Sequence, residues 1–238
     1  MSSNAPTKDV VLITGTSRGI GNYLANYYLD KNYKVIGCSR AIFDIPNDHY
    51  THIVADLSNE EDILNIFKII RKKFKRLDIL INNAAINPAI LNVAFLPFQT
   101  IENIYRVNVF APIMLCREAI KLMIRNKYGR IINLGSMATK HEVSGEALYT
   151  STKAAINAFT KVLSKEVESS GITANVLAPS VIETELSKAI DQEALFEVLN
   201  RNAIKKYGDF NDVSNLIDLL IKEESKSITG QLIYLGGV

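Results

Sequence analysis

Short apolar runs and amphipathic stretches alternate along this chain. The run Val10-Val-Leu-Ile13 is continuous and rich in branched side chains, which predicts a strand buried on both faces. Elsewhere apolar residues recur every three or four positions, as Ile63, Ile66 and Ile70 do, which predicts helices with one buried face. The predicted strands cover 10–13, 34–37, 52–55, 78–81, 130–134, 173–177 and 231–235, and the predicted helices cover 20–29, 58–74, 100–126 and 149–169.

Two of these helices also carry end signals. The sequence Ser58-Asn-Glu-Glu61 matches a capping box, in which a serine and a glutamate satisfy the first free N–H groups of a helix. Gly171 lies just beyond the helix 149–169, at a position where glycine commonly ends a helix. The helix 58–74 is therefore expected to begin at Ser58, and the helix 149–169 is expected to end before Gly171.

The alternation of strand and helix predicts an α/β fold with a parallel sheet and helices on both faces. No linker, repeat or low-complexity tract interrupts the 238 residues, so we expect one seven-stranded domain of the Rossmann type over 1–238, with a polar tail at 1–7. Ligands in such sheets bind beyond the carboxyl ends of the strands. Candidate chemistry is therefore sought directly after each strand.

Composition narrows the possible partners. Lys and Arg number 27 and Asp and Glu 25, a net charge of +2 that predicts neither a nucleic acid nor a membrane as partner. Two cysteines, Cys38 and Cys116, are too few for a disulfide scaffold, and His49, His52 and His141 show no metal-ligand spacing, so no metal is expected. The polar start and the lack of a long apolar segment predict a soluble, cytoplasmic protein.

A glycine-rich loop follows the first predicted strand. Glycines at 15, 19 and 21 permit a tight turn and a close approach of backbone to ligand, and the amides at the start of the next helix would face a pyrophosphate. A turn without a ligand is the alternative. The residues expected to bind the cofactor here are Gly15, Thr16, Ser17, Arg18, Gly19, Ile20 and Gly21.

The end of the second strand bears on the choice of dinucleotide. An NAD site usually offers an acidic residue there, whereas this chain has Gly37-Cys-Ser-Arg40. Arg40 can pair with a 2′-phosphate, and Arg18 is a second candidate. The alternative is that both are solvated surface arginines. NADP(H) is therefore favoured over NAD(H).

Tyr149, Lys153 and Ser136 form the candidate catalytic group. Tyr149 and Lys153 are four residues apart and share a helical face, and Ser136 follows the fifth predicted strand. A nearby ammonium lowers the pKa of a phenol from about 10, and a serine hydroxyl can stabilise charge on a substrate oxygen. A half-buried tyrosine beside a lysine, with an exposed loop serine, is the alternative. Tyr27 and Lys31 show the same spacing far from the expected site.

Over about residues 8–237 the chain resembles the short-chain dehydrogenase/reductase family, and most closely its 3-oxoacyl-(acyl-carrier-protein) reductase branch. Several motifs in the family's order carry the resemblance. They are Thr14-Gly-Thr-Ser-Arg-Gly-Ile-Gly21, Asp56-Leu57, Asn82-Asn-Ala-Ala85, Asn108, Ser136, Tyr149-x-x-x-Lys153, Pro179 to Thr184, and Ile228-Thr-Gly-Gln231.

The resemblance implies catalytic roles for four residues. Tyr149 would protonate the carbonyl oxygen during reduction. Lys153 would hold the nicotinamide ribose and lower the pKa of the tyrosine. Ser136 would orient the substrate, and Asn108 would lie at a helix kink and hold a water in a proton relay; a buried structural amide is the alternative for Asn108.

It also implies further contacts with the cofactor. Asp56 and Leu57 would line the adenine, although Asp56 is also plausible as a plain turn residue. Other expected cofactor residues are Asn83, Ala84, Pro179, Ile182 and Thr184, and Asn82 would brace the sheet. Two positions depart from the family pattern: Ala85 and Ser180 stand where glycine is usual, and Ser180 puts the contact with the carboxamide in question.

Three loops should form the substrate side: 86–100, 137–148 and a lid region at 183–207. The third loop carries apolar residues at near-helical spacing, which fit either a lid over an apolar pocket or a helix facing a dimer partner. His141 is expected to be a solvated loop residue. A mostly apolar rim suits an acyl or other lipophilic ketone, and the resemblance implies a homodimer or homotetramer.

We therefore expect an NADPH-dependent reductase that converts a ketone, such as a carrier-bound 3-oxoacyl thioester, into a secondary alcohol. Two alternatives stay open. One is an NAD(P)-dependent dehydrogenase of a sugar or other small alcohol, and the other is a non-catalytic dinucleotide-binding sensor.

Overall fold

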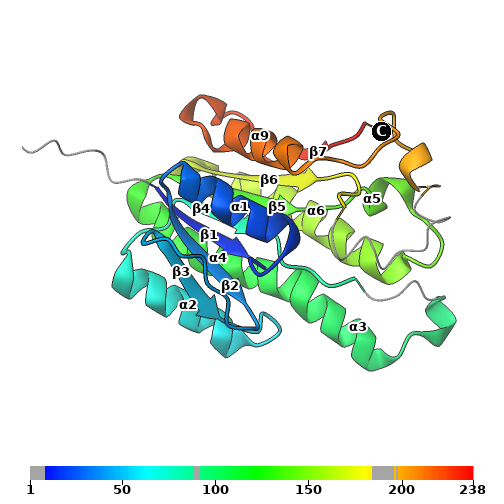
Figure 1. Ribbon diagram of the computed structural model, residues 1–238, viewed down its shortest axis with the longest axis horizontal. Helices are drawn as coiled ribbons and strands as arrows, with labels where there is room; N and C mark the ends of the chain where they lie inside the picture. Colours follow the sequence, from blue (N-terminus) through cyan, green and yellow to red (C-terminus); the bar gives the residue numbers. More distant parts are fainter. Residues whose placement is uncertain (1–8, 88–91, 184–195, 197, 238) are drawn as a thin grey trace, which may run out of the picture.

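Seven strands, all parallel, form a single sheet in the order β3-β2-β1-β4-β5-β6-β7, as the computed structural model shows (Figure 1). The structure describes residues 9–87, 92–183, 196 and 198–237. This is the predicted α/β architecture. The strands are β1 (Val10–Thr14), β2 (Lys34–Ser39), β3 (Tyr50–Val54), β4 (Ile79–Asn82), β5 (Gly129–Leu134), β6 (Ile172–Ala178) and β7 (Leu232–Tyr234).

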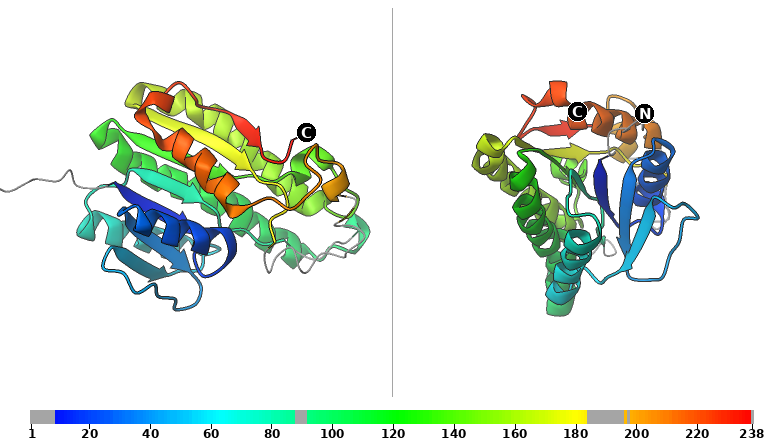
Figure 2. Two further views of the ribbon diagram at one scale, coloured as in Figure 1. Left: turned by 45° about the horizontal axis from the view of Figure 1, so that its top comes forward. Right: turned by 90° about the vertical axis from the view of Figure 1, so that its left-hand side faces the viewer.

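Helices cover both faces of the sheet (Figure 2). One face carries α1 (Gly19–Asp30) and α9 (Phe210–Ile221), and the other carries α2 (Glu60–Lys73), α4 (Ala111–Asn126) and α6 (Ala147–Val167). None of the described helices is both long and apolar enough to cross a lipid bilayer. The shorter elements are α3 (Phe98–Tyr105), α5 (Ala138–His141), a π-helical turn η2 (Arg106–Phe110), and the 3₁₀ turns η1 (Val93–Phe95), η3 (Glu168–Ser170) and η4 (Glu223–Ser225).

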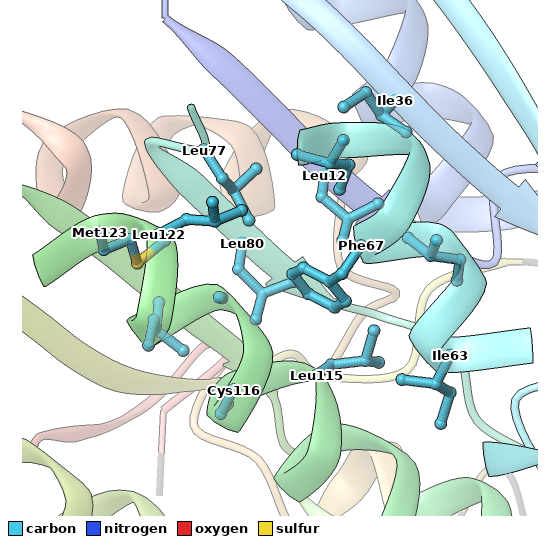
Figure 3. Close-up of a cluster of buried hydrophobic side chains, with 14 of the residues drawn as sticks. Leu12, Ile36, Ile63, Phe67, Leu77, Leu80, Leu115, Cys116, Leu122 and Met123 are labelled. Atoms are coloured by element: carbon cyan, nitrogen blue, oxygen red, sulfur yellow. The ribbon is translucent and has the colours of Figure 1, made fainter. Parts of the chain in front are cut away.

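The core beneath α2 and α4 shows why the strands read as continuous apolar runs. Leu12 of β1 and Leu80 of β4 meet Phe67 of α2 and Leu115 of α4, and all four side chains are essentially inaccessible to solvent (Figure 3). Burying one such side chain contributes about 1.5–3 kcal/mol. Because helices also cover the second face of the sheet, the central strands have no face turned to solvent on which polar side chains would alternate with apolar ones.

The stretch 100–126, predicted as one helix, is divided. The α3 helix passes through η2, where the hydrogen bonding widens to the π pattern, before α4 begins. Pro112 in the first turn of α4 explains the break, because proline has no N–H to bond the carbonyl of Asn108 four residues earlier.

The predicted Ser58 cap is wrong by one residue. The Asn59 side chain caps α2 by accepting a hydrogen bond from the Glu61 N–H at 2.8 Å. Ser58 is used differently, because its hydroxyl donates to the Asp56 carboxylate at 2.8 Å.

The α9 helix was not predicted. Its signals are nonetheless present in the sequence: Asp209 and Asp212 form a capping box, and Val213, Ile217 and Leu220 are fully buried at helical spacing. The helix packs beside α1 and completes the cover of that face.

Candidate active site

A cavity of about 560 Å³ lies at the carboxyl ends of the strands. Its walls come from the segments that follow β1, β2, β3, β4, β5 and β6, so it includes the crevice between β1 and β4, where the strand order reverses direction. Most predicted site residues line it. They are Gly15, Ser17, Arg18, Gly19, Ile20, Arg40, Asp56, Leu57, Asn83, Ala84, Ser136, Tyr149, Lys153, Pro179 and Ile182.

The glycine loop needs its glycines for steric reasons. Gly15 and Gly19 have φ angles of 74° and 57°, in the left-handed region that favours glycine. A Cβ atom on Gly21 would lie 2.2 Å from the Gly15 carbonyl oxygen. The loop is fixed from the neighbouring strand, because Asn83 Nδ2 donates to the Thr14 carbonyl at 2.8 Å and Thr14 Oγ1 accepts from the N–H of Asn83 at 3.0 Å.

The start of α1 suits an anion. Arg18 occupies the N-cap position and its side chain makes no capping hydrogen bond. The N–H groups of the first turn therefore have no side-chain acceptor at the cap and point toward the cavity end of the helix, where the partial positive charge of the helix lies. A dinucleotide pyrophosphate fits this arrangement.

Two loop residues lie behind the cavity wall. Thr16 is fully buried, and its hydroxyl hydrogen-bonds the Tyr50 hydroxyl at 3.0 Å. Gly21 faces the backbone of Gly15. Both support the loop from beneath, so a direct contact between the Thr16 side chain and a cofactor stays only a prediction.

Basic side chains mark the end of β2. Arg40 and Arg18 are both exposed and line the cavity, and no ion pair holds either of them among the residues that the structure describes. Asp56 follows β3 on the same side, and hydrogen bonds from Ser58, aided by the charge of Arg40, lower the pKa of its carboxyl. Only one of the Asp56 carboxylate oxygens is engaged by these bonds.

Tyr149, Lys153 and Ser136 converge on the cavity from two elements. Tyr149 lies in the first turn of α6 and Lys153 one turn later, and Ser136 follows β5. The Lys153 ammonium lies 5.7 Å from the Tyr149 ring centroid and donates to the Leu134 carbonyl at 2.8 Å. The Ser136 hydroxyl accepts a hydrogen bond from the Ala138 N–H at 3.1 Å.

The electrostatics of this group differ from the prediction. Burial raises the pKa of Tyr149 to about 12; a hydrogen bond with Ser136 acts against this rise and the charge of Glu146 adds to it. Burial also lowers the pKa of Lys153 to about 8. Desolvation thus outweighs the expected lowering of the tyrosine pKa, and at neutral pH the tyrosine holds its proton.

Asn108 lies in the π-helical turn, where the helix was expected to kink. Its side chain is buried and pairs with both backbone groups of Ile86, at 2.9 Å and 2.8 Å, and donates to Thr152 Oγ1 at 3.3 Å. Asn108 therefore joins the segment after β4 to α6. Its proposed part in a proton relay stays a prediction.

His141 is not the solvated residue that was expected. It lines the cavity, and its Nε2 hydrogen-bonds Asn202 Oδ1 at 2.8 Å. Asn202 Nδ2 in turn donates to Ser180 Oγ at 2.8 Å, so the serine that replaces the usual glycine is held from the chain segment before α9. Thr184 and much of the expected lid, residues 184–195 and 197, lie outside the described residues.

Glu146 was missed as a site residue. It lines the cavity three residues before Tyr149, burial raises the pKa of its carboxyl, and its electrostatic interaction with His141 acts against this rise. Its position on the same rim as Tyr149, at the very start of a helix, was the available signal. The rest of the substrate side is mainly apolar, with Ile86, Val107, Met137, Val143, Val181 and Val198 on the wall.

Comparison with known proteins gives a consistent result. The profile of the family described as short chain dehydrogenase matches residues 9–195. A 3-oxoacyl-(acyl-carrier-protein) reductase FabG from Vibrio cholerae is 32% identical over 234 residues, which are 96% of each chain. The FabG of Escherichia coli is 30% identical over 234 residues, again 96% of each chain.

Solved structures agree with this result. A 4-hydroxyisoleucine dehydrogenase complexed with NADH is 29% identical, with a TM-score of 0.86 over 97% of this chain and 98% of the other. ElxO with NADP bound is 30% identical, with a TM-score of 0.87 over 95% of this chain and 96% of the other.

Proposed function

This chain belongs to the short-chain dehydrogenase family and is an NAD(P)-dependent oxidoreductase, and we propose that it uses NADPH to reduce a ketone to a secondary alcohol. The observation that carries the proposal is the convergence of Tyr149, Lys153 and Ser136 with the glycine loop on one cavity. The intact set favours an enzyme over a non-catalytic sensor.

Tyr149 is the general acid. With a pKa of about 12 its hydroxyl is protonated at neutral pH, which is the form required to donate a proton to a carbonyl oxygen. Ser136 donates a hydrogen bond to the same oxygen, on which negative charge grows during reduction. Bound NADPH supplies the hydride that the carbonyl carbon accepts.

Lys153 holds the nicotinamide ribose. Its pKa of about 8 leaves most of the ammonium charged at neutral pH, although the side chain is only 5% exposed. A buried ammonium with a single carbonyl partner has further N–H groups to offer to ribose hydroxyls. Its charge also favours the phenolate that Tyr149 becomes after giving up its proton.

Arg40 and Arg18 are proposed to bind the 2′-phosphate of NADPH. Both are exposed on the cavity wall, and the end of β2 offers Ser39 and Arg40 where a carboxylate would repel that phosphate. The relatives include proteins solved with NADP and with NADH, so the preference rests on these arginines.

The apolar wall and the FabG relatives support a 3-oxoacyl thioester as substrate. Glu146 favours a second candidate. Among the described residues no donor pairs with its carboxylate, so it would suit a small polar alcohol or ketone that carries an ammonium or hydroxyl group. One of the similar structures is a 4-hydroxyisoleucine dehydrogenase, whose named substrate is of this kind.

The test is a set of initial rates with NADPH and NADH against acetoacetyl-coenzyme A, longer 3-oxoacyl thioesters and small amino or hydroxy ketones. We expect NADPH-dependent turnover, lowered at least about 100-fold in Tyr149→Phe. Tyr27→Phe is the matched control, because Tyr27 has the same spacing to a lysine but its hydroxyl donates to Asp218 at 2.7 Å, away from the cavity. Full activity in Tyr149→Phe would reject the acid assignment, and preference for NADH would reject the cofactor assignment.

A further inference from the structure

We propose that His52 and Tyr50 are positioning residues for the adenosine end of the cofactor site, and that they help the enzyme to select NADPH over NADH. They would do so by joining the glycine loop to the turn that carries Arg40. This inference rests on the proposed preference for NADPH. Neither residue contacts the cavity itself, and both lie on β3.

A continuous chain of hydrogen bonds carries the proposal. It begins at the buried Thr16 hydroxyl, 3.0 Å from the Tyr50 hydroxyl, which is 2.9 Å from Nδ1 of His52. The other ring nitrogen, Nε2, lies 3.1 Å from Ser39 Oγ and 3.2 Å from the Ala41 carbonyl oxygen. These hydrogen bonds thus connect the glycine loop to Ser39 and Ala41, the two neighbours of Arg40.

The acceptors fix the direction of these bonds. The Ala41 carbonyl can only accept, and Ser39 Oγ donates to it at 2.9 Å, so Nε2 of His52 must carry the proton. Nδ1 is then an acceptor for the Tyr50 hydroxyl, whose oxygen accepts from Thr16. Burial lowers the pKa of His52, which favours the neutral ring that this pattern requires.

The surrounding backbone leaves room for this chain and for little else. A Cβ atom on Gly37 would lie 2.2 Å from the Tyr50 hydroxyl oxygen and 2.5 Å from Thr16 Oγ1. Main-chain bonds from the N–H groups of Gly15 and Thr16 to the Cys38 carbonyl, at 2.9 Å and 3.2 Å, hold the same two segments together. The hydrogen bonds through Tyr50 and His52 therefore form a second link between the glycine loop and the end of β2.

The hydrogen bonds of His52 end on the turn that carries Arg40, and this position bears on the choice of cofactor. Ser39, Arg40 and Ala41 all line the cavity, so the turn that His52 holds is the one that presents the Arg40 guanidinium. A guanidinium binds a phosphate strongly only when its donors are held in place. Loss of these hydrogen bonds should weaken binding of the 2′-phosphate while leaving the rest of the dinucleotide site in place.

The experiment measures binding directly on the full chain. Dissociation constants for NADPH, NADH, 2′,5′-ADP and 5′-AMP are obtained by fluorescence or calorimetry for the wild type, His52→Ala, Tyr50→Phe and Arg40→Ala. We expect His52→Ala and Tyr50→Phe to weaken NADPH and 2′,5′-ADP about fivefold or more and NADH and 5′-AMP less than about twofold.

His49→Ala is the matched control, because the His49 side chain is exposed and hydrogen-bonds no other described residue, while its main-chain N–H and carbonyl bond Asn47 and Val35; all its constants should equal those of the wild type. Tyr50→Phe removes a single oxygen atom and keeps the test valid should His52→Ala fail to fold. If both variants keep the wild-type ratio of NADPH to NADH affinity while Arg40→Ala loses it, the positioning role is wrong and the NADPH assignment stands. Equal weakening of all four ligands also overturns it. If the wild type binds NADH more tightly than NADPH, both the positioning role and the NADPH assignment are wrong.

Discussion

Lys153 carries its charge in the interior, so replacing it with methionine should change how stability depends on pH. The side chain is 5% exposed, and its ammonium donates to the Leu134 carbonyl at 2.8 Å. Burial lowers its pKa from 10.5 to about 8, which means that the folded protein holds this proton less firmly than the unfolded chain does. Methionine has a similar length and no charge to desolvate.

The size of the effect follows from that pKa. One pKa unit corresponds to about 1.4 kcal/mol, so the buried ammonium costs roughly 3 kcal/mol of folding free energy at neutral pH. The methionine variant escapes this cost but leaves the Leu134 carbonyl without a donor, a loss of about 1–3 kcal/mol. We therefore expect the variant at pH 7 to be between equal in stability and about 2 kcal/mol more stable, and to be inactive.

The pH dependence gives the sharper test. Below about pH 8 both the folded and unfolded wild type hold the proton, and the difference between wild type and variant is constant. Between about pH 8 and 10.5 the unfolded chain still holds the proton while the folded protein has released it. Wild-type stability therefore rises relative to the variant by up to about 1.4 kcal/mol per pH unit in this window.

Urea unfolding of both proteins at fixed concentration, from about pH 7 to pH 10, measures this difference. Lys161→Met is the control, because Lys161 lies exposed on the same helix and should show no such trend. Parallel stability curves for wild type and Lys153→Met across the window would refute the reasoning, since they would mean that the ammonium keeps its ordinary pKa when buried.

Three further predictions concern other parts of the molecule. Gly21→Ala should lower the melting temperature and abolish NADPH binding, because its Cβ would meet the Gly15 carbonyl at 2.2 Å; an unchanged melting curve and affinity would contradict this. Glu146→Gln should lower the pKa of Tyr149 by removing a neighbouring charge, so the rise of alcohol oxidation with pH should move to lower pH; an unmoved profile would show that the two groups do not interact. If the homodimer or homotetramer that the family resemblance implies uses the exposed face of α6, then Val162→Glu, at a residue 57% exposed on that helix, should reduce the mass measured by sedimentation; a monomeric wild type would exclude that interface.

Local pattern was sufficient to predict the sheet. Short runs rich in apolar residues, alternating with helical patterns, predicted all seven strands to within two residues at each end. The signal was clearest for β1, which is buried on both faces and has no polar side chain in the run Val10–Ile13. The glycine loop and the Tyr149–Lys153 pair were also recognisable, since each depends on spacing along one element. The α9 helix was missed although its capping box and apolar spacing are present.

Competition between neighbouring groups was harder to anticipate. Ser58 was predicted to cap α2, but it donates to Asp56 and Asn59 caps the helix instead. The family resemblance placed a kink at Asn108, but Pro112, whose missing N–H lies where the hydrogen bonding changes, was not used to divide the helix 100–126.

The sequence by itself determined that the glycine loop and the catalytic side chains lie at the carboxyl ends of parallel strands. The strands' apolar pattern and the spacing of Gly15, Gly19 and Gly21 are local properties, and so they can be predicted one element at a time. Burial is different, because it depends on what other segments contribute. Only the tertiary structure shows that desolvation raises the pKa of Tyr149 and that β3 supplies a hydrogen-bonded support beneath the glycine loop.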